Sequence, residues 1–484
     1  MWVFIGYVVL IFFLIRDFFR KPRTYPPGPR PLPIAGNLFS VWYNLRKYRL
    51  HHTLWKEWTT KYGKILGLRL GSFNLVVVSG YDLIKEVSLR DVFAGRPDGF
   101  FYLLRSFGKK IGLVFSDGQT WSKTHRIVLR HLKNFGYGTR SMEVLITEEC
   151  RDLVKLCLSN TGPINANGMF DVSVVNILWR LIAGKRYNLN DKQLLRICHL
   201  INQIFQSVDM SGGILNFMPS LRHIAPDLTG YTKNKELHDD IYGFLREIVN
   251  QHRKTLDVQN PRDVIDAFLI EMLEGKGTYE DLLVVCLDLL EAGVETTSRT
   301  ADFLLLHIVR NEAVQAKLHK EIDETIGQSR LPTLNDRNRM VYTEAVLMEA
   351  LRISSVAPVG IPHMALDDAK LGKYLIPKGS CVLLLFHDLH NGDHWADPTN
   401  FRPERFITKE GNLIQDEWLM PFGSGKRKCI GEGLARSELF LFLTFLLQKF
   451  HIKLPNDDPP PSTEPVNGVS LSTQPFKVVF VPRN

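Results

Sequence analysis

PFGSGKRKCIGEG, residues 421–433, is the stretch on which the interpretation of this chain depends. Its first glycines predict a sharply turning backbone, and the apolar residues from Leu434 to Phe450 recur at helical spacing. Cys429 therefore lies just before a helix and directly after three cations, at positions 426–428. A helix N-terminus and nearby cations both favour a thiolate over a thiol. The stretch predicts a thiolate held against an electron-poor group, and the alternative is a buried structural cysteine.

The residue types of this stretch also fall in a fixed pattern. Phe422, Gly425, Arg427, Cys429 and Gly431 follow the order FxxGxRxCxG, which resembles the haem-binding signature of the cytochrome P-450 family. The resemblance implies that Cys429 is the axial iron ligand of haem b, that Arg427 pairs with a haem propionate, and that Phe422 belongs to the same cofactor site. It further implies a mainly α fold with small β-sheets, in which the haem lies between a long buried helix and the Cys loop.

Length and composition limit the class of protein. The 484 residues show no interior linker, and 45% hydrophobic with 23% charged residues is ordinary for a globular protein with a large core. The six cysteines have no CxxC spacing, which indicates reduced thiols in a body that faces the cytosol. The formal charge of +9 favours an acidic partner or an anionic membrane surface. Nucleic acid is not expected as a partner, because the sequence contains no DNA-reading motif.

Residues 1–20 predict an N-terminal membrane anchor. Met1 to Ile15 is apolar throughout, which is short for a spanning helix of about 20 residues, but Phe18 and Phe19 extend the apolar character. Positive charges on its C-terminal flank, at Arg16, Arg20, Lys21 and Arg23, leave the body on the cytosolic side. The prolines of residues 21–35 predict a stiff hinge, so residues 36–484 form the globular domain. A core helix or a cleaved signal peptide is the alternative for the first segment.

Residues 93–97, FAGRP, resemble the segment that in this family leads into the loop between the second and third helices. The resemblance implies that Arg96 is a second propionate partner. A surface arginine is the alternative. The loop that follows is aromatic, and in the family it roofs the substrate pocket, which assigns Phe100 and Phe101 to that pocket.

A basic helix is expected from residue 121 onward. Trp121 matches a family tryptophan that reaches the propionates, but the arginine usual four positions later is replaced by His125. Either protonated His125 or the neighbouring Arg126 would then supply the contact. The cations around this helix predict a basic proximal surface for an acidic reductase, with a solvated helix face as the alternative. They are Lys123, Arg126, Arg130, Lys133, Lys426 and Lys428.

The second decisive stretch is Tyr279 to Asn311, whose apolar first part predicts a buried helix. AGVETT, residues 292–297, places an acid and a hydroxyl inside the predicted buried helix. Burying such groups costs free energy unless they have a hydrogen-bond partner, so they indicate a functional role. The stretch resembles the family's oxygen-activation motif, [AG]Gx[DE]T[TS]. The resemblance implies that Thr296 organises proton delivery to dioxygen, that Glu295 supplies protons through water, and that Ala292 lets substrate lie against the helix. A Ser/Thr kink in a core helix is the alternative.

Three charged residues are expected to contact one another and to have a structural role, not a catalytic one. Glu349 and Arg352 are three positions apart on a predicted helix, and Arg405 belongs to the later motif PERF. ExxR, PERF and the Cys loop occur in the order of the family. The resemblance implies a buried charge network that stabilises the haem pocket, whereas Glu349 and Arg352 alone would suggest a surface pair.

The segment between these motifs, PVGIPH at residues 358–363, also resembles the family. By this resemblance Val359 faces the substrate above the haem and His363 donates to a propionate. A structural histidine is the alternative. Residues 468–475 resemble a hairpin tip that enters the pocket, which brings Leu471 to the substrate.

The resemblance spans the whole chain and implies a microsomal haem-thiolate monooxygenase of the endoplasmic reticulum membrane. One oxygen atom would enter an apolar substrate, with electrons from an NADPH-dependent reductase and with cytochrome b5 as a further candidate partner. Residues 93–112 are similar to an arthropod branch that epoxidises methyl farnesoate or farnesoic acid during juvenile hormone synthesis. The alternatives are a detoxifying or steroid-hydroxylating relative, and a haem-binding sensor or isomerase that does not activate dioxygen.

Overall fold

The computed structural model describes residues 1–18, 24–207, 210, 212–456 and 458–483. The expected flanking charges Arg20, Lys21 and Arg23, together with the boundary drawn between residues 20 and 21, lie outside the described residues. The helices are α1 (Trp2–Phe18), α2 (Leu38–Tyr48), α3 (His51–Tyr62), α4 (Tyr81–Leu89), α5 (Phe100–Leu104), α6 (Gly118–Asn134), α7 (Arg140–Ser159), α8 (Asp171–Ala183), α9 (Lys192–Ser207), α10 (Gly213–Phe217), α11 (Leu221–Ile224), α12 (Tyr231–Lys254), α13 (Val264–Leu273), α14 (Tyr279–Arg310), α15 (Glu312–Thr325), α16 (Val341–Ser354), α17 (Phe386–His390) and α18 (Glu432–Lys449).

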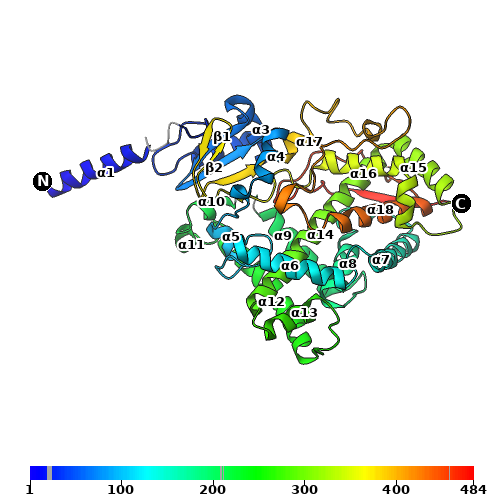
Figure 1. The fold of residues 1–484 in the computed structure, drawn as a ribbon. Helices are drawn as coiled ribbons and strands as arrows, with labels where there is room; N and C mark the ends of the chain where they lie inside the picture. Colours follow the sequence, from blue (N-terminus) through cyan, green and yellow to red (C-terminus); the bar gives the residue numbers. More distant parts are fainter. Residues whose placement is uncertain (19–23, 208–209, 211, 457, 484) are drawn as a thin grey trace.

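The strands are short and form small sheets at the periphery of this helical body (Figure 1). They are β1 (Ile65–Leu70), β2 (Phe73–Val78), β3 (Ile164–Asn165), β4 (His363–Met364), β5 (Ala369–Leu371), β6 (Tyr374–Ile376), β7 (Cys381–Leu384), β8 (Phe450–Lys453) and β9 (Lys477–Pro482). One sheet has the order β1-β2-β7-β4, with β2 and β7 parallel and the other pairs antiparallel. A second sheet has the order β3-β9-β8, and β5 pairs with β6. The expectation of a mainly α fold with small β-sheets is confirmed.

Helix α14 is the central element of the fold. A capping box between Thr278 and Asp281 fixes its start, because each side chain bonds the other's backbone N–H. The helix packs against α8, α9, α12, α16 and α18, so it is apolar on nearly all sides rather than on one face. The buried helix expected from Tyr279 to Asn311 is therefore present, ending at Arg310.

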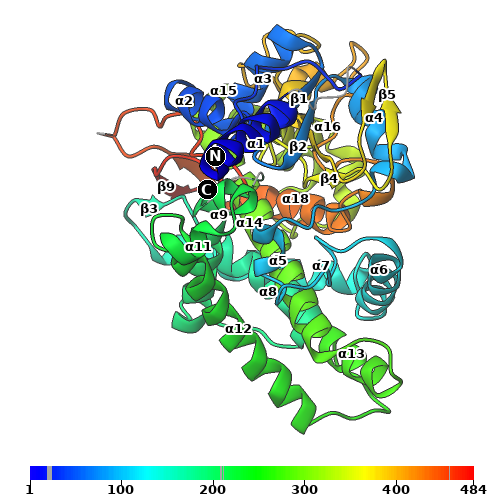
Figure 2. The same ribbon diagram turned by 90° about the vertical axis from the view of Figure 1, so that its left-hand side faces the viewer.

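The largest core joins α7, α8, α9, α12, α13, α14 and α18. Figure 2 shows α12 and α13 at the end of the molecule away from the β1–β2 sheet, as does Figure 1. The chain leaves the helical conformation between α12, which ends at Lys254, and α13, which begins at Val264. A smaller core lies between α3 and the sheet, where Trp55 and Leu68 are buried.

Helix α1 extends away from the rest of the chain in Figure 1, and its side chains from Trp2 to Phe13 are exposed. Among the described residues, none of the helices has both the length and the apolar character that crossing a membrane requires.

Candidate active site

The Cys loop is held by close backbone contacts before α18 begins. Gly425 has φ +69°, and a Cβ atom there would lie 2.1 Å from the carbonyl oxygen of Ser88, so only glycine fits. The N–H of Cys429 donates to the carbonyl oxygen of Phe422 at 2.9 Å, which closes the loop. Helix α18 starts at Glu432, so Cys429 lies just before a helix, as the sequence predicts.

The thiol of Cys429 differs from the other five in the chain. All six cysteines are free, as expected, but Cys429 is exposed whereas the others are buried. Its pKa is raised, chiefly by the protein packed around the rest of the side chain, although the N–H groups of Gly431 and Glu432 act in the opposite direction. The helix start and Lys428 act in the direction that the sequence predicts, but in the protein alone desolvation outweighs them.

Two guanidinium groups, those of buried Arg96 and half-buried Arg427, lie close together beside the Cys loop. Arg427 donates to the carbonyl oxygens of Ala94 (3.0 Å) and Ser116 (2.7 Å), and Arg96 donates to those of Val114 (3.0 Å) and Pro362 (3.1 Å). In the described part of the chain, neither guanidinium forms an ion pair, and Nη1 of Arg427 is buried without a hydrogen-bond partner. Burial lowers the pKa of Arg96 to about 9 and that of Arg427 to about 10, and the charge of Arg427 contributes to the shift at Arg96.

Three further predicted cofactor residues surround this pair. The Arg427 guanidinium carbon lies 4.1 Å from the ring centre of Trp121, and His125 stacks on the same tryptophan at 4.6 Å. His363 is buried, with Nδ1 2.8 Å from the carbonyl oxygen of Phe93. Burial, with a smaller contribution from Arg96 and Arg427, lowers the pKa of His363 to about 3. The structure thus gathers five of the predicted residues into one positively charged cluster.

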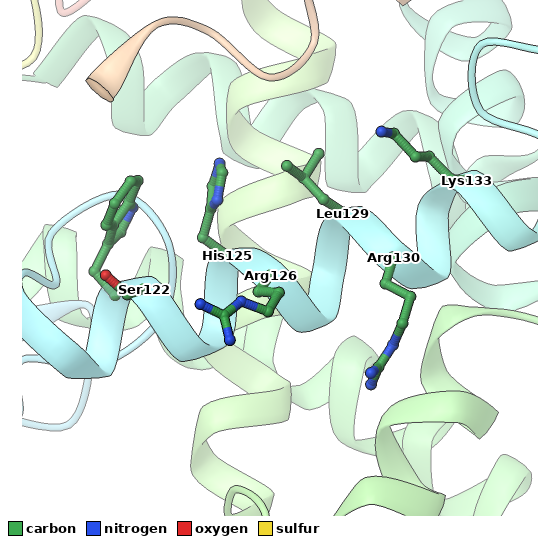
Figure 3. A pocket seen from close by; sticks show the side chains of 7 residues that line it. Ser122, His125, Arg126, Leu129, Arg130 and Lys133 are labelled. Carbon is green, nitrogen blue, oxygen red and sulfur yellow. The ribbon is translucent and has the colours of Figure 1, made fainter. Parts of the chain in front are cut away.

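Arg126 does not join that cluster. A hollow of about 540 Å³ lies beside α6, and Figure 3 shows His125, Leu129 and Lys133 projecting from one side of the helix, whereas Arg126 and Arg130 project from the other. The side chain of Arg126 is exposed. Of the two candidates for the missing arginine contact, only His125 therefore lies beside Trp121.

The predicted basic surface is partly neutralised. Lys426 pairs with Asp91 at 3.2 Å, Lys428 pairs with Glu432 at 2.7 Å, and Arg130 pairs with Glu271. Lys123, Arg126 and Lys133 are exposed, and within the described residues they have no ion-pair partner.

Part of the motif at residues 292–297 is accessible, although most of helix α14 is buried. Ala292 is exposed although Leu290 and Val294 on the same helix are buried. The hydroxyl of Thr296 donates to the carbonyl oxygen of Ala292 at 2.7 Å, so it remains within its own helix. The small residue and the hydroxyl therefore occupy one accessible strip of an otherwise buried helix.

Glu295 points to a different environment from Thr296. It is buried, with Oε1 3.4 Å from the amide of Asn202 on α9 and 3.5 Å from the hydroxyl of Ser470. Oε1 also lies 3.6 Å from Nε of Arg299. Burial raises the pKa of Glu295 to about 7, with Arg299 acting to lower it and Asp171 to raise it. The carboxyl group can therefore hold and release a proton near neutral pH.

The predicted pocket residues are placed on several elements. Val359 and Leu471 are buried, and the N–H of Leu471 donates to the carbonyl oxygen of Val356 at 2.8 Å, which fixes the predicted hairpin tip. Phe100 and Phe101 begin α5 and are half-buried. The ring of Phe100 lies under the Arg222 guanidinium at 4.7 Å.

The predicted charge network is present and buried. Glu349 accepts from Nε of Arg352 at 2.8 Å and from Nη2 at 2.9 Å, and it lies 3.0 Å from Nε of Arg405. The N–H of Arg402 donates to the same carboxylate at 2.8 Å.

Sequence reasoning missed a second buried network on α14. Asp288 accepts from the N–H groups of Leu113 (2.5 Å) and Val114 (3.1 Å), and it pairs with Arg105 at 2.5 Å. Arg105 also pairs with Glu291 at 2.6 Å. These bonds join the loop after α5 to α14. The sequence feature that could have indicated this network is the pair of acids Asp288 and Glu291, three positions apart at the end of an apolar helical run.

Comparison with known proteins identifies the family of this chain. The family model described as "Cytochrome P450" matches residues 26–480. The chain is 60% identical to farnesoate epoxidase from Bombyx mori, over 98% of this chain and 97% of that protein. It is 36% identical to probable cytochrome P450 305a1 from Drosophila melanogaster (99% and 98% covered) and 36% identical to cytochrome P450 2C23 from Rattus norvegicus (96% and 94% covered). The chain therefore belongs to the cytochrome P450 family.

Proposed function

We propose that this protein epoxidises a farnesoate, either methyl farnesoate or farnesoic acid. The observation that carries the proposal is the 60% identity to the Bombyx mori farnesoate epoxidase along nearly the full length of both chains. The more general activity follows from the family: the protein is a monooxygenase that uses haem b with a cysteine thiolate ligand and receives electrons from NADPH through a reductase.

We assign Cys429 as the iron ligand, and we assign the propionate contacts to Arg427, Arg96, His363 and Trp121. Phe422 contributes to the cofactor site by closing the Cys loop through its carbonyl oxygen. Two observations support this assignment. The guanidinium groups of buried Arg96 and half-buried Arg427, which have no carboxylate ion-pair partner among the described residues, carry a charge that a pair of propionates would compensate. The orphaned Nη1 of Arg427 offers a donor for one of them. His125 is a further contact, and Arg126 is assigned to the surface.

The assignment of Cys429 as iron ligand is compatible with the raised pKa that burial gives its thiol. Cys429 would bind iron as the thiolate, because a bound cation would favour loss of the proton from a coordinating thiol. Until then, desolvation keeps the proton on sulfur.

Bound haem supplies the activation of dioxygen, of which one atom enters a carbon–carbon double bond and the other leaves as water. The residues of this chain supply protons and exclude water. The Thr296 hydroxyl rotates from its bond to Ala292 to donate toward the accessible side of α14. Glu295, with a pKa of about 7, restores the proton through water. We assign no chemical step to Glu349, Arg352 and Arg405, which stabilise the fold around the site.

An apolar pocket suits a farnesoate, whose body is a branched hydrocarbon chain. We assign its walls to Phe100, Phe101, Val359 and Leu471, with Ala292 leaving room beside α14. The apolar side chains remove water from the hydrocarbon chain on binding, which supplies most of the affinity.

We also infer how the protein is placed in the cell. The apolar and exposed residues of α1 support an anchor within residues 1–20, followed by a hinge at residues 21–35, which holds the domain of residues 36–484 on the cytosolic side of the endoplasmic reticulum membrane. The exposed cations Lys123 and Lys133 support docking of an acidic reductase, with cytochrome b5 as a second candidate for the same face.

The proposal is tested by reconstituting the haem-loaded protein with an NADPH-dependent reductase and supplying methyl farnesoate or farnesoic acid. We expect one epoxide per NADPH consumed, and an analogue with all its double bonds reduced serves as the matched control. Hydroxylation of the analogue at a rate equal to that of farnesoate oxidation would favour the detoxifying alternative. Haem binding without oxygen incorporation into any apolar substrate would favour the sensor or isomerase.

A further inference from the structure

Two buried carboxyl groups, those of Glu295 and Asp302, and the partly exposed Asp171 share the guanidinium of Arg299. Arg299 lies one turn after Glu295 on α14, and its Nη2 is 2.5 Å from Asp171 on α8. Its Nη1 is 2.8 Å from Asp302, and its Nε is 3.6 Å from Glu295. Helices α8 and α14 pack against each other, so the cluster is a fixed part of the core.

The charges of this cluster do not balance. A single positive charge faces three acids, and among the described residues the other groups that contact them are neutral donors: the amide of Asn202, the hydroxyls of Ser298 and Ser470, and the N–H of Gly168. The thiol of Cys198, on α9, faces the same cluster, and burial raises its pKa above the ordinary range of a thiol. Because unpaired charges are costly in a protein interior, two of the three acids are expected to hold a proton.

The surroundings indicate which acid is ionised. The Asp171 side chain is 17% exposed and stands at the first position of α8, where the helix dipole favours a negative charge. Glu295 and Asp302 are 3% and 0% exposed, and in the described structure Oδ1 of Asp302 has no partner. Burial raises the pKa of Asp171 as well, but its exposure and the helix dipole make it the acid of the three that is best placed to be the anion paired with Arg299, whereas Glu295 and Asp302 are better placed to hold protons.

We propose that Arg299 and Asp171 are positioning residues that set the proton affinity of Glu295 in opposite directions. The positive charge of Arg299 favours the carboxylate of Glu295, and the negative charge of Asp171 favours its protonated form. The pKa of Glu295 responds to both charges in these directions. The inference rests on the proposed role of Glu295 as a proton donor, and it assigns the control of that role to residues outside the oxygen-activation motif.

The test measures protonation directly in the haem-loaded protein without substrate or reductase. The infrared carbonyl-stretching band of the protonated Glu295 carboxyl is identified by its loss in Glu295→Gln and is then titrated against pH. We expect Asp171→Asn to lower the midpoint by about one pH unit and Arg299→Gln to raise it by about one to three units. A merely structural role would move both midpoints in the same direction, or neither.

Asp152→Asn is the matched control, because Asp152 is also a partly exposed aspartate paired with an arginine, Arg186, at 2.6 Å. It should leave the Glu295 band in place. An unchanged midpoint in Asp171→Asn overturns the inference, even if Arg299→Gln does not fold. Because the band is read without turnover, a failure to oxidise farnesoate would refute the proposed function separately.

Discussion

Removing the carboxylate of Glu349 is predicted to destabilise the protein strongly while leaving the site residues in place. This carboxylate is the shared acceptor for Arg352, Arg405 and the N–H of Arg402, at 2.8 to 3.0 Å. In Glu349→Ala the two guanidinium groups face each other in a buried space, and among the described residues Arg352 retains as hydrogen-bond acceptors the carbonyl oxygens of His390 and Pro398. Two like charges without their counterion are the main cost.

Breaking a buried pair by removing one partner costs about 3–5 kcal/mol, and the exposed fraction of both Glu349 and Arg352 is zero. In urea, such a loss lowers the unfolding midpoint by on the order of 1 M for a protein with an ordinary dependence on denaturant. The double variant Glu349→Ala/Arg352→Leu is expected to recover part of the loss, since it removes an unpaired charge as well.

Tryptophan fluorescence during urea unfolding of the haem-loaded protein is a suitable assay. The ring centre of Trp395 lies 5.5 Å from the Arg352 guanidinium carbon, so it reports on this region. Asp239→Ala removes an exposed partner of Lys235 and serves as the control, with little change expected in the midpoint. A midpoint for Glu349→Ala within error of the control would refute the reasoning.

Other outcomes can be tested in the same preparation. Cys429→His should abolish the red-shifted absorption band of the reduced, carbon-monoxide-bound protein, and its persistence would exclude Cys429 as the ligand. Arg427→Leu should lower haem retention during gel filtration, because it removes the unpaired donor beside Trp121. Thr296→Ala should reduce the rate of product formation by about a hundredfold and lower the product formed per NADPH, and an unchanged ratio would exclude the hydroxyl from proton delivery. The double charge reversal Lys123→Glu/Lys133→Glu should raise the KM for the reductase and weaken its dependence on salt, with no effect on the carbon monoxide spectrum.

The elements that could be predicted from the sequence are those fixed by local patterns. The buried helix is set by an apolar run and a capping box, and Cys429 precedes α18 because the glycine turn allows only that backbone path. The Glu349–Arg352 pair is also local, three positions apart on α16. In each case the residues that determine the feature lie within one or two turns of one another.

Contacts between distant segments could not be derived in this way. The partners of Arg427 are carbonyl oxygens 333 and 311 positions away, and a backbone acceptor leaves no residue type in the sequence to mark it. Asp171 and Arg299 are 128 positions apart, so nothing local distinguishes them from surface charges. The pKa of a side chain depends on the same long-range packing: at Cys429 burial raises the pKa of the thiol, although the helix start and Lys428 act to lower it as the sequence predicts.

The charge of His125 also depends on groups that lie far from it in the sequence. The sequence offers a protonated histidine in place of an arginine, yet burial and the nearby charge of Arg427 lower the pKa of His125. A propionate beside it would act in the opposite direction, because an opposite charge within a few ångströms favours the protonated ring. The substitute for the missing arginine is therefore expected to become cationic only when haem binds, so His125 should make haem affinity more dependent on pH than an arginine at the same position. His125→Arg should flatten that dependence, and an unchanged pH profile of haem affinity would show that His125 stays neutral in the loaded protein.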